Sequence, residues 1–319
     1  MQHLILLVSL SLVPLSNVFS WGFYGHKLIN KSAVFTLPPE MFGFYKLHSD
    51  YLSEHAIDPD KRRYSNADEA CRHYIDLDYY EKVFPIDTVP QRWKDAVEMY
   101  SEDTLLAYGI VPWHVQKMLY RLTEAFKNND YYAILHYSAD IGHYMADACV
   151  PLHATMNYNG QLTNQQGIHG FWESRLAELF SNQYDLFTGN AYYLHASQKK
   201  IWEACEGSYL ALDSVLTFEH KLSTSFDDHK KYVLEKKGNQ LVKNYSLAYA
   251  KAYHQQLNGM VERRICLAIQ LVGCLWYTAW VDAGQPDLTK INPDSKQENQ
   301  LQIDLEKITE QQPILGRPE

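Results

Sequence analysis

The sequence predicts an all-α protein built as one mostly helical domain. Apolar residues recur at helical spacing along most of the 319 residues, and the alternation typical of strands is scarce. No linker or change of composition divides the chain, and all-helical domains of this length are common. Two polar, irregular stretches, 55–89 and 150–169, are expected to be long functional loops.

Seven segments are expected to form helices. They are 26–35, 90–100, 112–127, 131–148, 170–181, 193–220 and 239–283, the last with a break near Gly259. Pro90 and Pro112 stand where a first helical turn tolerates proline, and Asn128-Asn129-Asp130 predicts a turn between two helices. The polar tail, 284–319, is expected to be loose or to lie on the surface.

The first twenty residues are interpreted as a cleaved signal peptide. An apolar core from Leu4 to Leu12 is followed by Pro14 and by small residues up to Ser20, as at a signal-peptidase site. The alternative is a short buried or membrane-anchoring helix, although the apolar run is too short to span a bilayer comfortably. We therefore expect a secreted or periplasmic protein whose mature chain begins at Trp21, with the helical domain at 21–283 followed by the tail.

Charge and cysteine content exclude few functions. A net charge of −9 and a pI near 5.9 argue against binding through a broad basic surface, although a metal site could still bind phosphate locally. The five cysteines are odd in number and follow no framework spacing, so disulfides are allowed but not required.

Histidines and carboxylates follow a pattern suited to metal binding in "HYMADACVPLH", residues 143–153. His143 and Asp147 are four residues apart on one helical face, and His153 follows Pro151, which ends the helix. His169 and Glu173 repeat the four-residue spacing. Zinc prefers imidazole nitrogen and carboxylate oxygen ligands. A similar pair, His136 and Asp140, is expected to have a structural or supporting role.

Two further stretches extend this set to nine positions. "WGFYGH" begins at Trp21, and Asp58 stands fifteen residues before His73. The order Trp, His, Asp, His, His-x3-Asp-x5-His, His-x3-acid, spanning Trp21 to Glu173, resembles the superfamily that joins zinc-dependent phospholipases C with the single-strand-specific zinc nucleases S-one and P-one. This resemblance implies a mostly helical fold with three zinc ions, in which the mature N-terminal tryptophan is itself a ligand.

The resemblance also implies a ligand set for each zinc ion. One ion would be held by Asp58, His73, His143 and Asp147, a second by His153, His169 and Glu173, and a third by Trp21, His26 and a shared Asp147. Asp58 and Asp147 are thus the expected catalytic carboxylates. Asp58 is preferred over Asp60 and Asp68 for its offset from His73 and its "A-x-D" context. Asp76 and Asp78 are expected to be structural or to support the ligands.

The implied activity is hydrolysis of a phosphodiester at its P–O bond, with a zinc-bound hydroxide as the nucleophile. Glu173 and the short interval from His153 to His169 resemble the phospholipases C, whereas the intervals from Trp21 to His26 and from Asp58 to His73 resemble the nucleases. We slightly favour a phospholipase C-like enzyme, with a single-strand nuclease as the alternative. A secreted zinc-binding protein without turnover is the remote alternative.

Substrate contacts are expected near the ligands. Arg63, with Lys61 and Arg62, is a candidate for contacting a phosphate, and a solvated basic run is the alternative. Tyr74 is a candidate aromatic floor for a base or head group, with ordinary packing as its alternative, and Trp172 is expected in the core. No stable protein partner is implied, and a monomer is expected.

Overall fold

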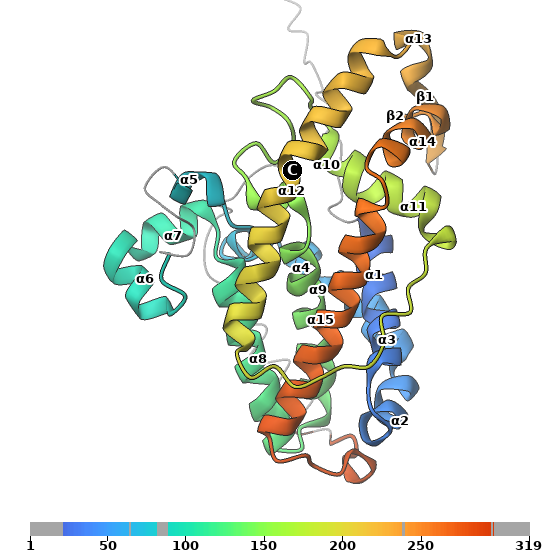
Figure 1. Cartoon of the computed structure of the whole chain (residues 1–319). Coiled ribbons are helices and arrows are strands. Elements are labelled where there is room, and N and C mark those ends of the chain that lie inside the picture. The colour runs from blue at the N-terminus through green and yellow to red at the C-terminus, as the bar shows by residue number, and fades with distance from the viewer. Residues whose placement is uncertain (1–21, 64, 82–88, 238–239, 295, 297–319) are drawn as a thin grey trace, which may run out of the picture.

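A computed structural model describes residues 22–63, 65–81, 89–237, 240–294 and 296 (Figure 1). The predicted signal peptide and Trp21 lie outside the described residues. The prediction of an all-α domain is confirmed, since helices dominate and the only sheet in the described part has two strands. The first half contains α1 (Gly22–Ala33), η1 (Val34–Thr36), α2 (Pro39–Leu47), α3 (Ser49–His55), α4 (Asp58–Arg62), η2 (Ala70–Arg72), α5 (Leu77–Glu81), α6 (Trp93–Tyr100), α7 (Glu102–Tyr108), α8 (Val111–Lys127) and α9 (Tyr131–Ala148).

The second half continues with helices and a single hairpin. It contains η4 (Pro151–Ala154), α10 (Ile168–Gly170), the π-helical turn η5 (Phe171–Arg175), α11 (Leu176–Phe180), η6 (Ser181–Gln183), α12 (Ser197–Ser225), α13 (Asp228–Lys231), β1 (Tyr232–Lys237), β2 (Gln240–Tyr245), α14 (Leu247–Gln256), α15 (Met260–Asp282) and η7 (Leu288–Lys290). In Figure 1 the long helices α8, α12 and α15 run beside one another, and the hairpin projects from one end of the bundle.

Helix α9 is the centre of the bundle. It contacts α1, α3, α8, α12 and α15, and nearly all of its residues from Ala133 to Ala148 are buried. The Asp130 side chain caps its start by accepting a hydrogen bond from the Ala133 amide at 3.1 Å, as the Asn-Asn-Asp turn predicts. A helix buried on every side can hold polar groups only if they are partnered, and two of those in α9, His143 and Asp147, belong to the candidate metal centre described below.

The carboxyl end of α9 is held by the C-terminal half of the chain. Arg264 of α15 donates a hydrogen bond from Nε to the Cys149 carbonyl at 2.7 Å, and Ser208 of α12 donates to the Ala148 carbonyl at 2.7 Å. These two donors satisfy carbonyl oxygens that the helix itself leaves unpaired. The positive charge of Arg264 also lies at the negative end of the helix dipole.

Helices α1 and α9 approach closely at Gly142. A Cβ atom at this position would lie 1.9 Å from Oδ1 of Asn30, so only glycine fits there. Asn30 is fully buried and donates from Nδ2 to the carbonyls of Leu52 and Ala139, both at 3.1 Å. The contact fixes the distance between the two helices and therefore between the histidines that they carry.

The predicted helix at 131–148 coincides with α9, but other expectations needed correction. The segment 239–283 divides into β2, α14 and α15, and α12 begins at Ser197 and continues to Ser225. The hairpin β1–β2 was not expected, although Gly238-Asn239 in the sequence between its strands is a pair typical of hairpin turns. The loop 55–89 contains α4, η2 and α5, which are too short to show helical periodicity.

The remaining expectations concern the tail, the cysteines and one apolar helix. The tail begins as a packed segment, because Leu288 and Ile291 are buried and η7 contacts α2. All five cysteines are free thiols. Helix α15 is long and apolar enough to cross a membrane, but 67% of its most apolar window is buried within the protein, as in the core helix of a bundle.

Candidate metal centre

Buried histidines and carboxylates converge around Asp147. Its Oδ2 atom lies 2.9 Å from Nδ1 of His73 and 3.2 Å from Nε2 of His143, and its Oδ1 atom lies 3.5 Å from Nε2 of His26. All four side chains are fully buried. The helical spacing of His143 and Asp147 places both on one face of α9, as the sequence predicts.

Asp60 lies next to two members of this group. Oδ1 of Asp60 lies 3.8 Å from both His73 Nδ1 and His143 Nε2, and these two nitrogens are 3.0 Å apart. Ligands bound about 2.0–2.1 Å from one tetrahedral ion lie roughly 3.4 Å from each other. The donor atoms of His73, His143 and Asp147 therefore have separations that suit a single ion, and Asp60 lies beside two of them.

Asp58, the predicted ligand, does not join this group. Its carboxylate binds Nδ1 of His55 at 2.6 Å and Nζ of Lys61 at 2.8 Å, and it is partly exposed. The two partners lower the pKa of Asp58 to about 2 against the opposing effect of burial. Two residues further along α4, the side chain of Asp60 faces α9 instead. The assignment of Asp58 as a metal-ligating and catalytic carboxylate is therefore wrong, and Asp60 replaces it in the group.

The predicted second group is brought together as expected. His153 Nε2 lies 3.6 Å from Glu173 Oε1, and His169 Nε2 lies 2.6 Å from Glu173 Oε2. The donor atoms of His153, His169 and Glu173 all fall within 4.8 Å of one another. His169 is in α10 and Glu173 in the π-helical turn η5, so this short segment supplies two of the three donors.

His26, near the start of α1, belongs to a third grouping. It lies with Asp147 and Glu173 within the same 4.8 Å limit, and it also meets Asp60 and His143. Its ring stacks on that of His143, with 3.9 Å between centroids and 21° between planes. Trp21, the remaining predicted ligand, lies outside the described residues, immediately before α1.

Backbone carbonyls orient two of the histidines. Nδ1 of His143 is 2.8 Å from the Ala56 carbonyl, and Nδ1 of His153 is 2.6 Å from the His73 carbonyl. A carbonyl oxygen can only accept a hydrogen bond, so each Nδ1 carries the proton. The Nε2 atom of each ring is thereby directed to the cluster, as is usual for metal-ligating histidines.

The electrostatics of the cluster keep its carboxylates ionised. Burial would raise the pKa of Glu173, but His169 and His153 outweigh it and lower this pKa to about 2. Burial would raise the pKa of Asp147, but His143 and His153 outweigh it and hold this pKa well below its usual range. Burial lowers the pKa of His26, whereas Asp147 and Asp60 outweigh burial at His143 and raise its pKa to about 9. Without bound metal, both ring nitrogens of His143 therefore carry a proton at neutral pH.

A second layer of polar residues lies behind His73 and was not found from the sequence. Glu69 is buried 3.7 Å from Nε2 of His73, and it accepts hydrogen bonds from Arg72 at 2.6 Å and from the Tyr144 hydroxyl. Arg62 reaches Asp140 at 2.7 Å and Tyr144 at 3.3 Å. Arg62 therefore stabilises buried acids, rather than being the solvated or phosphate-facing residue considered above. These residues are far apart in sequence, and no local spacing indicates the network.

The other predicted residues take mainly structural positions. Asp78 accepts hydrogen bonds from Thr155 at 2.8 Å and from the Met156 amide at 3.1 Å, so it fixes the turn after His153. Asp76 is buried close to it in sequence, and Asp68 lines a separate pocket. His136 pairs with Asp140 at 3.5 Å, beside Arg62. Trp172 is fully buried in the core, as expected.

Neither predicted substrate contact gains support from its position. Tyr74 is buried and its hydroxyl donates to the Ala107 carbonyl at 3.4 Å, while Gly109 packs against its ring and backbone. The expectation that Tyr74 forms an aromatic floor for substrate is therefore wrong, because the ring is enclosed by protein. Arg63 is partly exposed at the end of α4, and its role stays a prediction.

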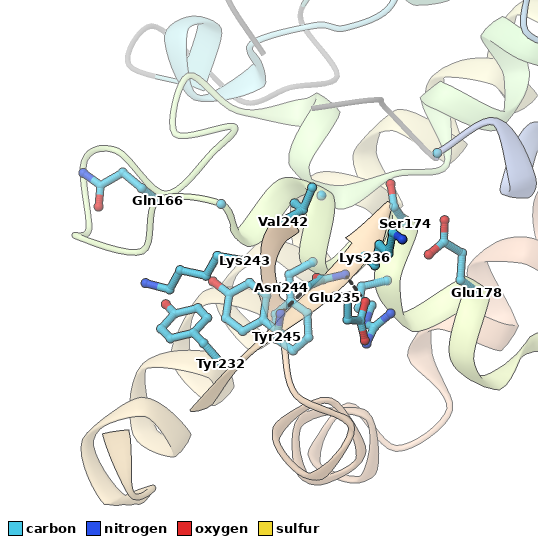
Figure 2. A pocket seen from close by; sticks show the side chains of 15 residues that line it. Gln166, Ser174, Glu178, Tyr232, Glu235, Lys236, Val242, Lys243, Asn244 and Tyr245 are labelled. Carbon is cyan, nitrogen blue, oxygen red and sulfur yellow. Dashed lines mark hydrogen bonds and ion pairs between the residues drawn. The ribbon is translucent and has the colours of Figure 1, made fainter. Parts of the chain in front are cut away.

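A pocket of about 500 Å³ lies on another face of the segment that carries His169 and Glu173 (Figure 2). Its walls come from the segment 166–178, from Gly22 and from the hairpin β1–β2. None of the clustered histidines or carboxylates lines it. Across the pocket, Arg175 and Glu235 are joined by an ion pair of 2.5 Å.

Buried polar atoms test whether the cluster suits a metal. Asp147 Oδ1 is buried at the centre of the cluster and has no hydrogen-bond partner within the described part of the chain. Buried polar atoms are almost always partnered, so this atom indicates an unfilled requirement for a ligand. With nitrogen and carboxylate donors converging and no cysteine among them, the donor set suits a divalent metal. No known protein-family model matches the chain, and neither does any curated protein.

Proposed function

We propose that the protein is a secreted, zinc-dependent phosphodiester hydrolase with three zinc ions, closer to the phospholipases C than to the single-strand nucleases. The observation that carries the proposal is the convergence of the buried His73, His143 and Asp147 at separations of 2.9–3.2 Å, with Asp60 3.8 Å from both histidines and a second group only a few ångströms away. Closely spaced metal sites of this composition are typical of enzymes that cleave phosphate esters.

Each group in the cluster would hold part of the metal centre. His73, His143 and Asp147, with Asp60 beside the two histidines, would bind one ion, and His153, His169 and Glu173 a second. His26 and Asp147, with the N-terminal residue Trp21, would bind the third. When bound, the ions supply Lewis acidity to a phosphoryl oxygen and lower the pKa of water from 15.7 to about 7.

The chain's own residues prepare this chemistry in three ways. The carbonyls of Ala56 and His73 fix the ring orientation of His143 and His153, so little reorganisation is needed on binding. Asp147 presents one oxygen to His73 and His143 and the other to His26, which suits a carboxylate shared between two ions. The low pKa values of Asp147 and Glu173 keep both groups as anions at neutral pH.

The corrected ligand changes the balance between the two kinds of substrate. The interval from Asp58 to His73 was one of two features favouring a nuclease. With Asp60 as the ligand the interval is thirteen residues rather than fifteen, so it no longer favours a nuclease. The interval from Trp21 to His26 still resembles that of the nucleases. Glu173 and the interval from His153 to His169 resemble the phospholipases C.

Hydrolysis of bis-p-nitrophenyl phosphate tests the proposal. We expect turnover that a chelator abolishes and added zinc restores. Zinc-loaded protein without any turnover would favour the non-catalytic zinc-binding protein. Parallel assays on phosphatidylcholine and on single-stranded DNA then distinguish the two enzymes, and we expect the phospholipid to be cleaved faster.

The N-terminal ligand connects export with activity in this proposal. An α-amino group has a pKa of about 7.7–8.0 and must be neutral to bind zinc. A chain that keeps one residue before Trp21 is therefore expected to hold one zinc fewer. Three zinc ions per chain in such a variant, measured by metal analysis, would contradict the assignment of Trp21.

A further inference from the structure

The hairpin β1–β2 concentrates exposed apolar side chains. Among the described residues, fifteen large apolar side chains are exposed, and six of these fall between residues 232 and 247. They are Tyr232, Val233, Leu234, Leu241, Val242 and Leu247. Leu234 and Leu241 are the most exposed of the six, at 64% and 69%. Five of them are in the hairpin strands, and such a concentration in one short segment is typical of an interaction surface.

The register of the hairpin combines these leucines with lysines on one face. Leu234 pairs with Lys243, and Lys236 pairs with Leu241. Directly paired residues, and residues two apart on one strand, point to the same side of a sheet. Leu234, Lys236, Leu241 and Lys243 therefore share one face, which we call the Leu/Lys face.

This face is basic on a chain with a net charge of −9. It carries Lys236 and Lys243 and no acid, and the one acid of the hairpin strands is Glu235. Glu235 is on the opposite side of the hairpin, where Arg175 and Asn244 bind its carboxylate. Lys236 and Lys243 are exposed, and Lys243 lies over the Tyr232 ring at 3.8 Å. Figure 2 shows Lys243 and Tyr232 next to one another.

We propose that the Leu/Lys face docks the protein on an anionic lipid bilayer. Leu234 and Leu241 would enter the interface, and Lys236 and Lys243 would meet lipid phosphates. Aliphatic side chains beside lysines complement a membrane surface, which offers both acyl chains and negative charge. Nucleic acid would use the lysines but gain little from exposed leucines, because its backbone is polar and its bases bind aromatic side chains.

The base of the hairpin is packed onto the segment that carries two of the metal-centre donors. Tyr245 stacks on Phe171 with 3.8 Å between ring centroids, and Phe171 lies between His169 and Glu173 in the sequence. The ion pair between Arg175 and Glu235 is a second attachment. Docking would thus bring the metal centre close to the bilayer. Docking is a property separate from the proposed hydrolysis, and vesicle binding measures it without any catalytic assay.

Vesicle co-sedimentation of the full mature chain tests this inference. We expect binding to vesicles of phosphatidylcholine containing phosphatidylglycerol, and much weaker binding to phosphatidylcholine alone. The double variant Leu234→Ser/Leu241→Ser is expected to bind at least about tenfold more weakly, and so is Lys236→Glu/Lys243→Glu. As a matched control, Leu47→Ser/Leu210→Ser alters leucines that are 78% and 77% exposed elsewhere, and it should bind like the parent.

Circular dichroism shows whether each variant is folded. Turnover of a soluble diester, equal in the parent and in Leu234→Ser/Leu241→Ser, separates docking from catalysis. The inference is overturned if the parent binds neither kind of vesicle, or if both hairpin variants bind as the parent does. Retention of single-stranded DNA that only the lysine variant loses, without vesicle binding, would identify a nucleic-acid surface instead. A dimer that only the leucine variant loses would identify a contact between copies.

Discussion

The imidazole rings of His26 and His143 stack face to face, 3.9 Å apart, although 117 residues separate them in sequence. His26 is in the first part of α1 and His143 in the second half of α9. The stacking is set by the close approach of the two helices, where Gly142 faces Asn30. The arrangement of the candidate metal ligands therefore depends on a helix contact that contains none of them.

Replacement of Gly142 tests that dependence. Gly142→Ala would place a methyl group against the Asn30 amide and push α1 from α9, so we expect a loss of about 1–3 kcal/mol in the free energy of unfolding. Thermal denaturation measures it. Gly43→Ala is the matched control, because nothing lies within 4 Å of its added carbon in α2, and it should be neutral or stabilising by up to ~1 kcal/mol. Equal effects of the two changes would contradict the proposed helix contact.

A pair of substitutions in α4 tests the corrected ligand. Asp60→Asn removes a carboxylate that faces His73 and His143, so we expect metal affinity to fall by more than the ~10–100-fold that loss of an outer partner costs. Asp58→Asn breaks only a partly exposed contact with His55 and Lys61, and the metal content should stay unchanged. Metal analysis after dialysis decides between them, and the reverse result would restore Asp58 as the ligand.

Asp78 offers a test of how His153 is positioned. Asp78→Ala releases Thr155 and the Met156 amide, so the turn after His153 is less constrained. We expect the metal held by His153, His169 and Glu173 to bind about 10–100-fold more weakly. Asp78→Asn keeps one acceptor oxygen and should recover part of this affinity. Titration with a competing chelator gives the affinities; if Asp78→Ala bound every ion as the parent does, the turn would have no role.

The raised pKa of His143 predicts a pH dependence for metal-free protein. Asp147 and Asp60, acting against burial, raise this pKa to about 9, above the value of about 6.5 expected in the unfolded chain. The resulting stability is fully present below pH ~6.5 and is lost as the pH rises through 9. Metal-free protein should therefore melt at a lower temperature at pH 9 than at pH 6.5.

Zinc-loaded protein is the control for this pH effect. Binding displaces the additional proton from His143, so the melting temperature should vary less over the same range. At pH 7 the addition of zinc to weakly buffered protein should also release protons, which an indicator dye detects. A metal-free melting temperature that does not fall toward pH 9 would exclude the raised pKa.

Sequence reasoning succeeded where the geometry is local. The four-residue spacings of His143 with Asp147 and of His169 with Glu173 produce neighbouring side chains on any helical turn, so each pair can be found without a fold. The all-α architecture follows in the same way from the helical period of the long segments. Histidines distant in sequence, such as His26 and His73, were placed only through the family resemblance.

The choice between Asp58 and Asp60 shows where such reasoning stops. Side chains that are two residues apart on a helix point in directions that differ by about 200°. Only one of Asp58 and Asp60 can therefore face α9. Which one does so depends on how α4 is rotated against α9, a tertiary contact without a local signature. The network of Arg62, Glu69 and Tyr144 was missed for the same reason, since its members meet only in the folded chain.

Every described donor of the centre lies between His26 and Glu173, yet the helix that carries His143 and Asp147 is closed at its end by Ser208 and Arg264. The segment that contains the donors is therefore not structurally independent of the rest of the chain. A shortened chain that keeps all of them but lacks α12 and α15 would expose the apolar sides of α8 and α9 and leave two terminal carbonyls of α9 without these donors. Design or recombination that transfers this centre to another scaffold would need to transfer a guanidinium and a hydroxyl from the far half of the chain as well.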